Sequence, residues 1–163
     1  MPVASYAIAL GSNRWTRHGG PAATLRAAAD RLGVSRLSRV HETAALGPAG
    51  RRFANAAAIL ASDLPPLALL RRLKLLERRF GRRGGRRWGP RALDLDIILW
   101  SGGPHAHGAL TIPHPAFRTR RFVLDPLVEI AAAWRDPVTG RSMRQLAHRL
   151  RRPRPVDRPR ARA

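Results

Sequence analysis

Two aspartates, Asp94 and Asp96, stand two positions apart at the start of an apolar run rich in branched residues. Over residues 93–100, apolar side chains alternate with a second set that begins with these aspartates, which is the period of a β-strand. Strand geometry turns both carboxylates to one face, close enough to share a hard cation. The alternative is a solvated strand end or a salt-bridge pair, which the repulsion between two adjacent like charges disfavours.

A cluster of arginines precedes this pair. Guanidinium groups bind phosphate oxygens in bidentate fashion, and paired acids hold the metal that a polyphosphate carries, so the segment predicts a polyphosphate site. The sequence contains neither G-x-x-x-x-G-K-[ST] nor G-x-G-x-x-G, so side chains and metal must bind the phosphates. The arginines of the cluster are Arg78, Arg79, Arg82, Arg83, Arg86, Arg87 and Arg91.

The length and composition of the chain restrict its class. Its 163 residues are expected to form one domain with a single core, with no membrane segment and no signal peptide. The chain has no cysteine, which excludes disulfides and thiolate metal sites and is consistent with the cytoplasm, where we expect the protein.

The net charge of +21 suggests an RNA-binding module as an alternative function. Lys74 is the only lysine, so thirty of the 31 basic residues are arginine, and they are spread along the whole chain. An RNA-binding module would not explain two aspartates inside the basic segment, and no RNA-binding signature or aromatic platform is present. We therefore expect no specific nucleic-acid partner.

Two segments resemble the signatures of the 6-hydroxymethyl-7,8-dihydropterin pyrophosphokinase family of folate synthesis. The first is Arg87-Trp88-Gly89-Pro90-Arg91 followed by Leu93-Asp94-Leu95-Asp96, which matches R-W-G-P-R-x-L-D-L-D before an apolar strand. The second is Leu110-Thr111-Ile112-Pro113-His114-Pro115, with Arg118, Arg120 and Phe122 downstream, which matches L-T-x-P-H-P followed by R-x-F. The resemblance extends from about Ala7 to Leu150. The chain departs from the family pattern at Ala44-Ala45, in the short 47–53 loop and in the Arg/Gly-rich 83–87 loop.

The resemblance implies an enzyme that acts on small molecules, and we expect it to be a monomer. It would transfer the diphosphate of ATP to the dihydropterin and release AMP, with two Mg²⁺ ions on Asp94 and Asp96. The intact Asp pair argues against a relative that has lost activity. The positions implied to bind phosphates are Arg82, Arg91, His114 and Arg120, and those implied along the nucleotide are Glu77, Trp88, Ile97 and Thr111. Ile97 is equally well explained as core, and Glu77 as one half of a structural ion pair with an arginine.

The same resemblance places the pterin on a second set of residues. A flat, aromatic pterin needs stacking rings and an amide-like partner at its edge. Phe53 and Asn55 lie two apart on a predicted strand, and Phe122 would supply the opposite ring. The alternative for each phenylalanine is the core, whereas a buried amide such as that of Asn55 requires polar partners. Thr43, Leu46 and Gly47 would contribute backbone groups to the pterin edge.

The remaining sequence predicts the elements that position these residues. Strands are expected at 4–10, 34–43, 53–61, 93–100 and 110–112. Helices are expected at 21–32, closed by Gly33, over 63–80 with Asp63 as cap, and from a Ser142–Gln145 capping box to about Leu150. Residues 82–87 are expected to form an exposed mobile loop, and the apolar 122–127 segment to dock on the core. The resulting α+β fold, by resemblance ferredoxin-like with helices on a mainly antiparallel sheet, would occupy 1–150, with a disordered Pro/Arg tail over 151–163.

Overall fold

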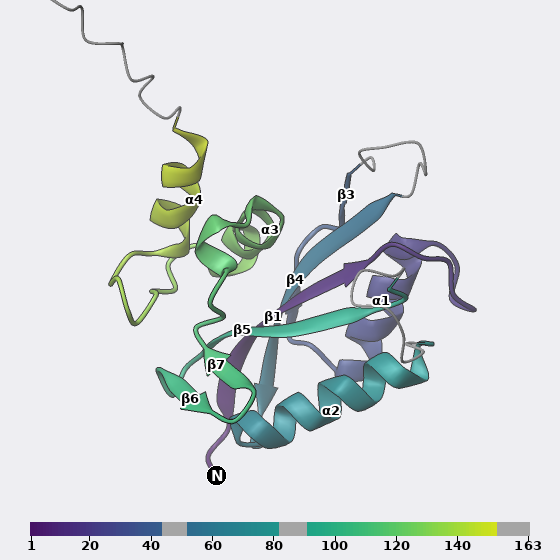
Figure 1. Cartoon of the computed structure of the whole chain (residues 1–163), viewed down its shortest axis with the longest axis horizontal. Helices are drawn as coiled ribbons and strands as arrows, with labels where there is room; N and C mark the ends of the chain where they lie inside the picture. The colour runs from purple at the N-terminus through teal and green to yellow at the C-terminus, as the bar shows by residue number, and fades with distance from the viewer. Residues whose placement is uncertain (44–51, 82–90, 153–163) are drawn as a thin grey trace, which may run out of the picture.

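The computed structural model describes residues 1–43, 52–81 and 91–152, and Figure 1 shows their arrangement. The strands are β1 (Ala4–Ser12), β2 (Arg36–Leu37), β3 (His41–Thr43), β4 (Phe53–Ser62), β5 (Asp94–Trp100), β6 (His105–His107) and β7 (Leu110–Ile112). The helices are α1 (Pro21–Leu32), α2 (Pro66–Arg79), α3 (Arg121–Ala131) and α4 (Met143–Arg151), with a 3₁₀ turn at Phe117–Thr119. In these ranges, no helix is long and apolar enough to cross a bilayer.

The main sheet is antiparallel and has the strand order β2-β4-β1-β5, with β3 on the same edge of β4 as β2. The β1–α1–β2/β3–β4–α2–β5 order is the split β-α-β arrangement of ferredoxin-like folds, which confirms the predicted α+β class. A separate hairpin of β6 and β7 follows β5.

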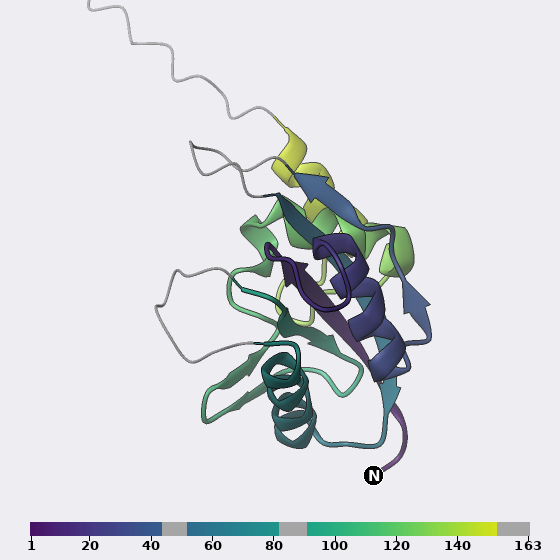
Figure 2. The same ribbon diagram turned by 90° about the vertical axis from the view of Figure 1, so that its right-hand side faces the viewer.

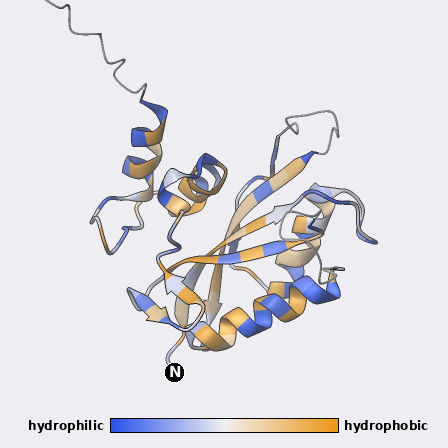
Figure 3. Cartoon of the chain, in the orientation of Figure 1, coloured by the Kyte–Doolittle hydropathy of each residue, from blue (hydrophilic) through white to orange (hydrophobic). Residues whose placement is uncertain are grey.

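Helices lie on both faces of the sheet, with α1 and α2 on one side and α3 and α4 on the other (Figures 1 and 2). On one face, Tyr6, Ile8 and Leu10 of β1 pack with α1 and α2. On the other face, Ala57 and Ile59 of β4 pack with α3 and α4. Figure 3 shows the hydrophobic colour along the strands, with hydrophilic bands at the Asp94 end of β5 and on α2.

Local sequence signals predicted several elements correctly. Helix α1 has the predicted bounds, and Gly33 closes it at φ 68°. The capping box of α4 is present, since the Gln145 backbone N–H donates to the Ser142 hydroxyl and the Gln145 side chain accepts from the Ser142 N–H. The helix ends at Arg151, one residue beyond the expected end.

Other predictions about the elements were wrong in detail. The strand expected at 4–10 extends two residues further as β1, because Gly11 and Ser12 also pair with β4. The strand expected over 34–43 is split into β2 and β3, because the Ser38 hydroxyl accepts the Ala57 N–H where a strand carbonyl would otherwise stand. Asp63 does not cap α2. That helix begins after Pro65, which makes no side-chain cap bond.

The sequence also missed helix α3. Residues 122–127 do dock on the core, but as part of a helix that contains Pro126 and has no side-chain cap. Pro126 is the sixth residue of α3, where it removes one intrahelical hydrogen bond, and the burial of the apolar face of the helix offsets this cost. The apolar residues Val123, Leu127 and Ile130, all buried in the structure, have the spacing of one helix face, and this spacing is the sequence signal that could have revealed the helix.

Candidate active site

The Asp pair lies at the start of β5, which is an edge strand of the main sheet. Asp94 is paired with Gly11 and Asp96 with Ala9, while the intervening Leu95 is buried in the core beneath α1 and α2. Both carboxylates therefore lie on the opposite face, half-buried, as the alternation predicted. The alternation fails further along, because a bulge leaves Ile98 without a partner in β1. Ile98 and Leu99 consequently pack on the same side, and Trp100 returns to the α1/α2 side.

Small residues separate the Asp pair from Asn55. The register aligns Asn55 of β4 with Gly11 and Asp94, and Ala57 with Ala9 and Asp96. A Cβ built on Gly11 would lie 3.4 Å from Asn55 Oδ1, so the amide lies over the glycine. On this face, the Asn55 amide therefore lies on one side of β1 and the two carboxylates lie on the other. Only Gly11 and Ala9 of β1 stand between them.

The charges around the Asp pair are only partly balanced. Arg91 Nη1 lies 3.2 Å from Asp94 Oδ1. Burial, and then the charges of Asp94 and Glu77, raise the pKa of Asp96 above its ordinary value, although Lys74 and His114 act in the opposite direction. A raised carboxyl pKa means that the ionised form lacks stabilisation, which a bound cation would supply.

His114 is held beside this pair by its backbone. Its N–H donates to the Ile98 carbonyl at 3.0 Å, and its Nδ1 accepts the Ala116 N–H at 3.2 Å. This bond assigns the proton of the neutral ring to Nε2, which is then a donor. Burial, and the charge of Arg120, lower the pKa of His114, while Asp96 and Asp94 act to raise it. The ring therefore lies within electrostatic reach of both aspartates and of Arg120.

The chain has four phenylalanines, and their exposure divides them into two classes. Phe80 and Phe117 are core residues. Phe53 and Phe122 are 43% and 49% exposed, so the core alternative fails for the two rings that were assigned to the pterin. Phe53 begins β4 on the Asn55 face, and Phe122 lies in the first turn of α3, which covers that face further along. The Arg120 guanidinium lies 5.6 Å from the Phe122 ring centroid.

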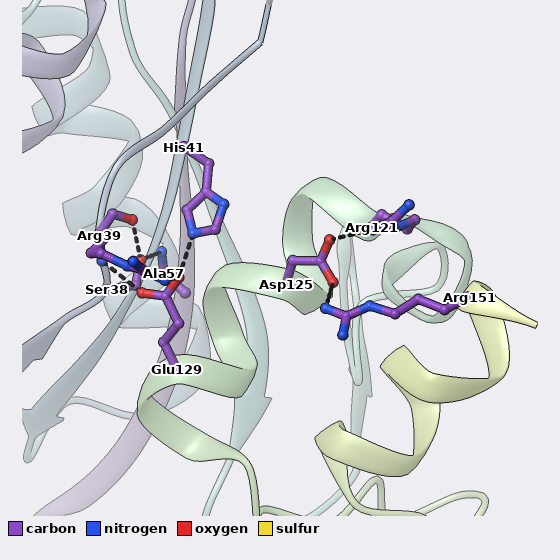
Figure 4. A network of polar contacts seen from close by, with 8 residues as sticks. All are labelled: Ser38, Arg39, His41, Ala57, Arg121, Asp125, Glu129 and Arg151. Atoms are coloured by element: carbon purple, nitrogen blue, oxygen red, sulfur yellow. Dashed lines mark hydrogen bonds and ion pairs between the residues drawn. The ribbon is translucent and has the colours of Figure 1, made fainter.

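A polar network that the sequence did not reveal connects β3 to α3 (Figure 4). Glu129 accepts the Arg39 backbone N–H at 2.9 Å and contacts His41 Nε2. Burial alone would raise the pKa of Glu129, but the hydrogen bonds from Arg39 and His41 lower it. His41 pairs with Asn55 and Thr43 with Phe53. The network thus links β3, which pairs with β4 at Asn55, to α3, which carries Phe122.

Two positions assigned to the nucleotide are buried in the core. Ile97 is 3% exposed and packs in the α1/α2 layer, as its core alternative predicted. The Glu77 side chain is fully buried, and Lys74 Nζ lies 2.8 Å from Glu77 Oε1. Glu77 therefore forms an ion pair with a lysine, whereas an arginine had been expected in the structural alternative.

Thr111 of β7, by contrast, is exposed, and it lines a cavity of about 490 Å³ together with Pro113 and Arg118. Arg82, Trp88, Leu46 and Gly47, and the loop expected at 82–87, lie outside the described residues. No group of three or more His, Cys, Asp or Glu side chains within 1–43, 52–81 and 91–152 is arranged to hold a metal.

Comparison with known proteins gives a consistent result. The sequence profile described as 7,8-dihydro-6-hydroxymethylpterin-pyrophosphokinase (HPPK) matches residues 7–132. A protein of Pseudomonas aeruginosa named 2-amino-4-hydroxy-6-hydroxymethyldihydropteridine pyrophosphokinase is 40% identical over 146 residues, covering 85% of this chain and 87% of its own. A Synechocystis protein of the same name is 40% identical over 117 residues, or 72% of this chain. The aligned part spans 60% of that relative's length.

The solved structures that resemble this fold are more distant in sequence. The crystal structure of Plasmodium falciparum HPPK-DHPS superposes with a TM-score of 0.68 at 13% identity. It covers 90% of this chain and 42% of the longer one. This likeness supports the fold.

Proposed function

The chain belongs to the HPPK family, and on that premise we propose that it transfers the diphosphate of ATP to 6-hydroxymethyl-7,8-dihydropterin. The hydroxymethyl oxygen would attack the β-phosphorus of ATP, and the bond from that phosphorus to the oxygen shared with the α-phosphate would break, releasing AMP. The observation that carries the proposal is the shared face of Asp94, Asp96 and Asn55 across Gly11. This shared face supports the proposal that the polyphosphate and the pterin bind next to each other on one sheet.

The donor set fits Mg²⁺, which prefers carboxylate, phosphate and water oxygens. Asp94 and Asp96 would hold two ions, and because burial and the charge of Asp94 raise the pKa of Asp96, a bound cation would stabilise its ionised form. When bound, the ions neutralise the charge that develops on the phosphates and orient them for in-line displacement.

The phosphates would be held by the cationic and donor groups beside the Asp pair. Arg91 lies against Asp94, while His114 offers Nε2 and Arg120 its guanidinium. Arg82 would complete this set. Along the nucleotide we retain Trp88, Thr111, Ile97 and Glu77 as proposals. The burial of the last two side chains leaves them roles through packing or backbone.

The pterin would lie between Phe53 and Phe122, with its polar edge on Asn55. The exposure of both rings and the position of the amide over Gly11 support this placement. Thr43, Leu46 and Gly47 would meet the pterin edge through backbone groups, and Thr43 lies directly across the sheet from Phe53.

We also propose that the enzyme works as a monomer in the cytoplasm, on small molecules and without a specific nucleic-acid partner. The lack of cysteine is consistent with a reducing compartment. Light scattering during gel filtration tests the monomer.

A coupled assay of AMP release tests the function. Purified chain, MgATP and the dihydropterin should release AMP, and omission of the dihydropterin or of Mg²⁺ should abolish release. AMP release that does not depend on the dihydropterin would reject the proposed acceptor. Salt-sensitive binding of RNA with no AMP release would favour the nucleic-acid alternative.

A further inference from the structure

The outer edge of β5 is closed by side chains of α2. The β5 strand is last in the order β2-β4-β1-β5, so within the part of the chain that the structure describes one side of it has no strand neighbour in this sheet. Leu95 lies between the two aspartates. Its N–H donates to Glu77 Oε1 at 2.8 Å, and its carbonyl accepts from Lys74 Nζ at 3.2 Å. Both polar backbone groups of this residue are therefore bound by one turn of one helix.

If this contact only closed the edge of β5, a buried carboxylate would be a costly way to do so. The Glu77 side chain is fully buried, and burying a carboxylate carries a desolvation penalty unless the charge is paired and hydrogen-bonded. Its partner Lys74 is the only lysine in a chain with thirty arginines. A compact ammonium can direct separate protons to Glu77 Oε1 and to the Leu95 carbonyl, which a planar guanidinium fork does not match.

We propose that Lys74 and Glu77 are positioning residues that fix the orientation of the Asp pair, an inference that rests on the proposed function. A strand that slips by one residue turns every side chain to the other face. Next to the aspartates, β5 is already irregular, because the bulge at Ile98 interrupts its ladder with β1. Binding both polar groups of Leu95 holds Asp94 and Asp96 on the substrate face.

The pairing of a lysine with a glutamate also has an electrostatic consequence. An unpaired ammonium behind β5 would neutralise part of the negative charge that the site needs for Mg²⁺. Lys74 and Glu77 act on the pKa of the Asp96 carboxyl in opposite directions, since Lys74 lowers it and Glu77 raises it. The Lys74–Glu77 pair, called the clamp below, thus holds the backbone of β5 through Leu95 without adding a net charge beside the Asp pair.

The test compares Glu77→Met, which removes the acceptor, with Glu77→Gln, which keeps an oxygen for the Leu95 N–H. The double variant Lys74→Met/Glu77→Met removes both charges together. It takes the place of Glu77→Met in the test if that variant alone does not fold. Arg71→Met is the matched control, because it removes an exposed cation from the same helix. The measurements are amide hydrogen exchange without ligand, calorimetric binding of Mg²⁺ with a non-hydrolysable ATP analogue, and AMP release.

In Glu77→Met and in the double variant, we expect the Leu95 amide to exchange about 10-fold faster or more, while the amides of β1 and β4 keep their protection. Mg²⁺ binding should weaken. The value of kcat should fall on the order of 10²-fold while KM for the dihydropterin changes little, because misplacing the reacting groups slows the chemical step more than it weakens substrate binding. Glu77→Gln should recover the Leu95 protection and most of kcat. The control should match wild type in all three measurements.

Two outcomes overturn the positioning role. If Leu95 exchanges faster but Mg²⁺ binding and kcat stay at the wild-type level, the clamp is only structural. If Leu95 exchange does not respond, the clamp does not hold β5. Failure of the proposed function is distinct from both, because the wild-type chain would then release no AMP. The exchange and Mg²⁺ measurements would still decide whether the clamp orients the Asp pair.

Discussion

The backbone N–H of His114 donates to the carbonyl of Ile98 at 3.0 Å, so the segment between Pro113 and Pro115 is fastened directly to the Asp strand. Ile98 is the residue at the β5 bulge, two positions beyond Asp96. The irregularity in the ladder therefore supplies an acceptor on the edge of the strand, and the histidine is positioned from its main chain. Its side chain remains available for a ligand.

This arrangement predicts that His114→Ala separates function from folding. The backbone bond to Ile98 survives the substitution, so the melting temperature should stay near wild type. Loss of the Nε2 donor should lower kcat/KM for ATP by roughly 10–100-fold, the scale of one charge-assisted hydrogen bond. AMP-release kinetics at varied ATP would measure it. A large fall in melting temperature with normal kinetics would contradict the assignment.

The second prediction concerns the pterin residues. Phe122→Ala and Asn55→Ala should weaken binding of the dihydropterin by about 2–4 kcal/mol, through lost stacking and a lost edge hydrogen bond, and should leave ATP binding nearly unchanged. Calorimetric titration with each ligand measures both effects. Leu75→Ala, another exposed apolar residue, is the control and should alter neither affinity. Equal losses for the two ligands would mean that these residues support the fold and not the pterin.

The sequence predicted correctly the features that depend on residues close together in the chain. The bounds of α1, its left-handed glycine and the α4 capping box depend on residues within a turn of one another. The common face of Asp94 and Asp96 depends only on strand period. The exposed positions of Phe53 and Phe122 required the structure, because aromatic side chains in apolar segments more often belong to the core.

Contacts between distant segments were not readable from the sequence. His41 and Glu129 are 88 residues apart, and nothing in either segment marks them as partners. The β5 bulge arises from the pairing with β1, so the pattern of residues 93–100 alone predicts uninterrupted alternation. Helix α3 lacks a capping side chain and contains a proline, which removes the usual signal for a helix start.

The third prediction tests the C-terminal boundary. Arg151 belongs to α4, and its Nη2 lies 2.8 Å from Asp125 Oδ1, so the domain is cut more safely after Arg152 than after Leu150. Deleting residues 153–163 should leave AMP release within about 2-fold of wild type, because their Pro/Arg sequence has no apolar stripe to bury. Kinetics and a thermal melt of the truncated chain check this. A melting temperature several degrees lower would show that the tail docks.

The fourth prediction concerns pH and Asp136, a fully buried carboxylate bound by Arg118 at 2.6 and 2.8 Å. Hydrogen bonds from Arg118 outweigh burial and lower the pKa of Asp136 to about 2. A depressed pKa stabilises the fold above the unfolded value near 3.8, and this contribution is lost as pH falls towards 2. Asp136→Asn should therefore cost about 2 kcal/mol of unfolding free energy at pH 7.

Urea unfolding of wild type and Asp136→Asn between pH 7 and pH 3 measures this difference, which should shrink at the acid end. Asp125→Asn is the control, because Asp125 makes more exposed ion pairs with Arg121 and Arg151. Its cost should stay below about 1 kcal/mol. A pH-independent cost of Asp136→Asn would show that shape, and not charge, holds this contact.

The last prediction concerns the Asp pair itself. Asp94→Asn or Asp96→Asn keeps the shape of the side chain but removes one negative charge from the proposed Mg²⁺ site. Turnover should fall by roughly 10²–10³ or more, the scale of losing one electrostatic partner of the transition state. Higher Mg²⁺ should restore part of the rate. The double variant should cost less than the sum of the two singles, because both carboxylates serve one metal cluster.

Folding should respond in the opposite direction. Without ligand, either substitution relieves repulsion between two half-buried carboxylates, so the melting temperature should hold or rise, more for Asp96, whose pKa is raised by burial. The Asp94 variant also loses the ion pair with Arg91. Because this pair is partly exposed, it contributes little to the free energy of unfolding. Turnover at several Mg²⁺ concentrations tests the predicted loss of rate, and thermal melts without ligand test the predicted effect on folding. Variants that melt much lower yet turn over normally would make the pair structural, and the proposed chemistry would then have no metal site.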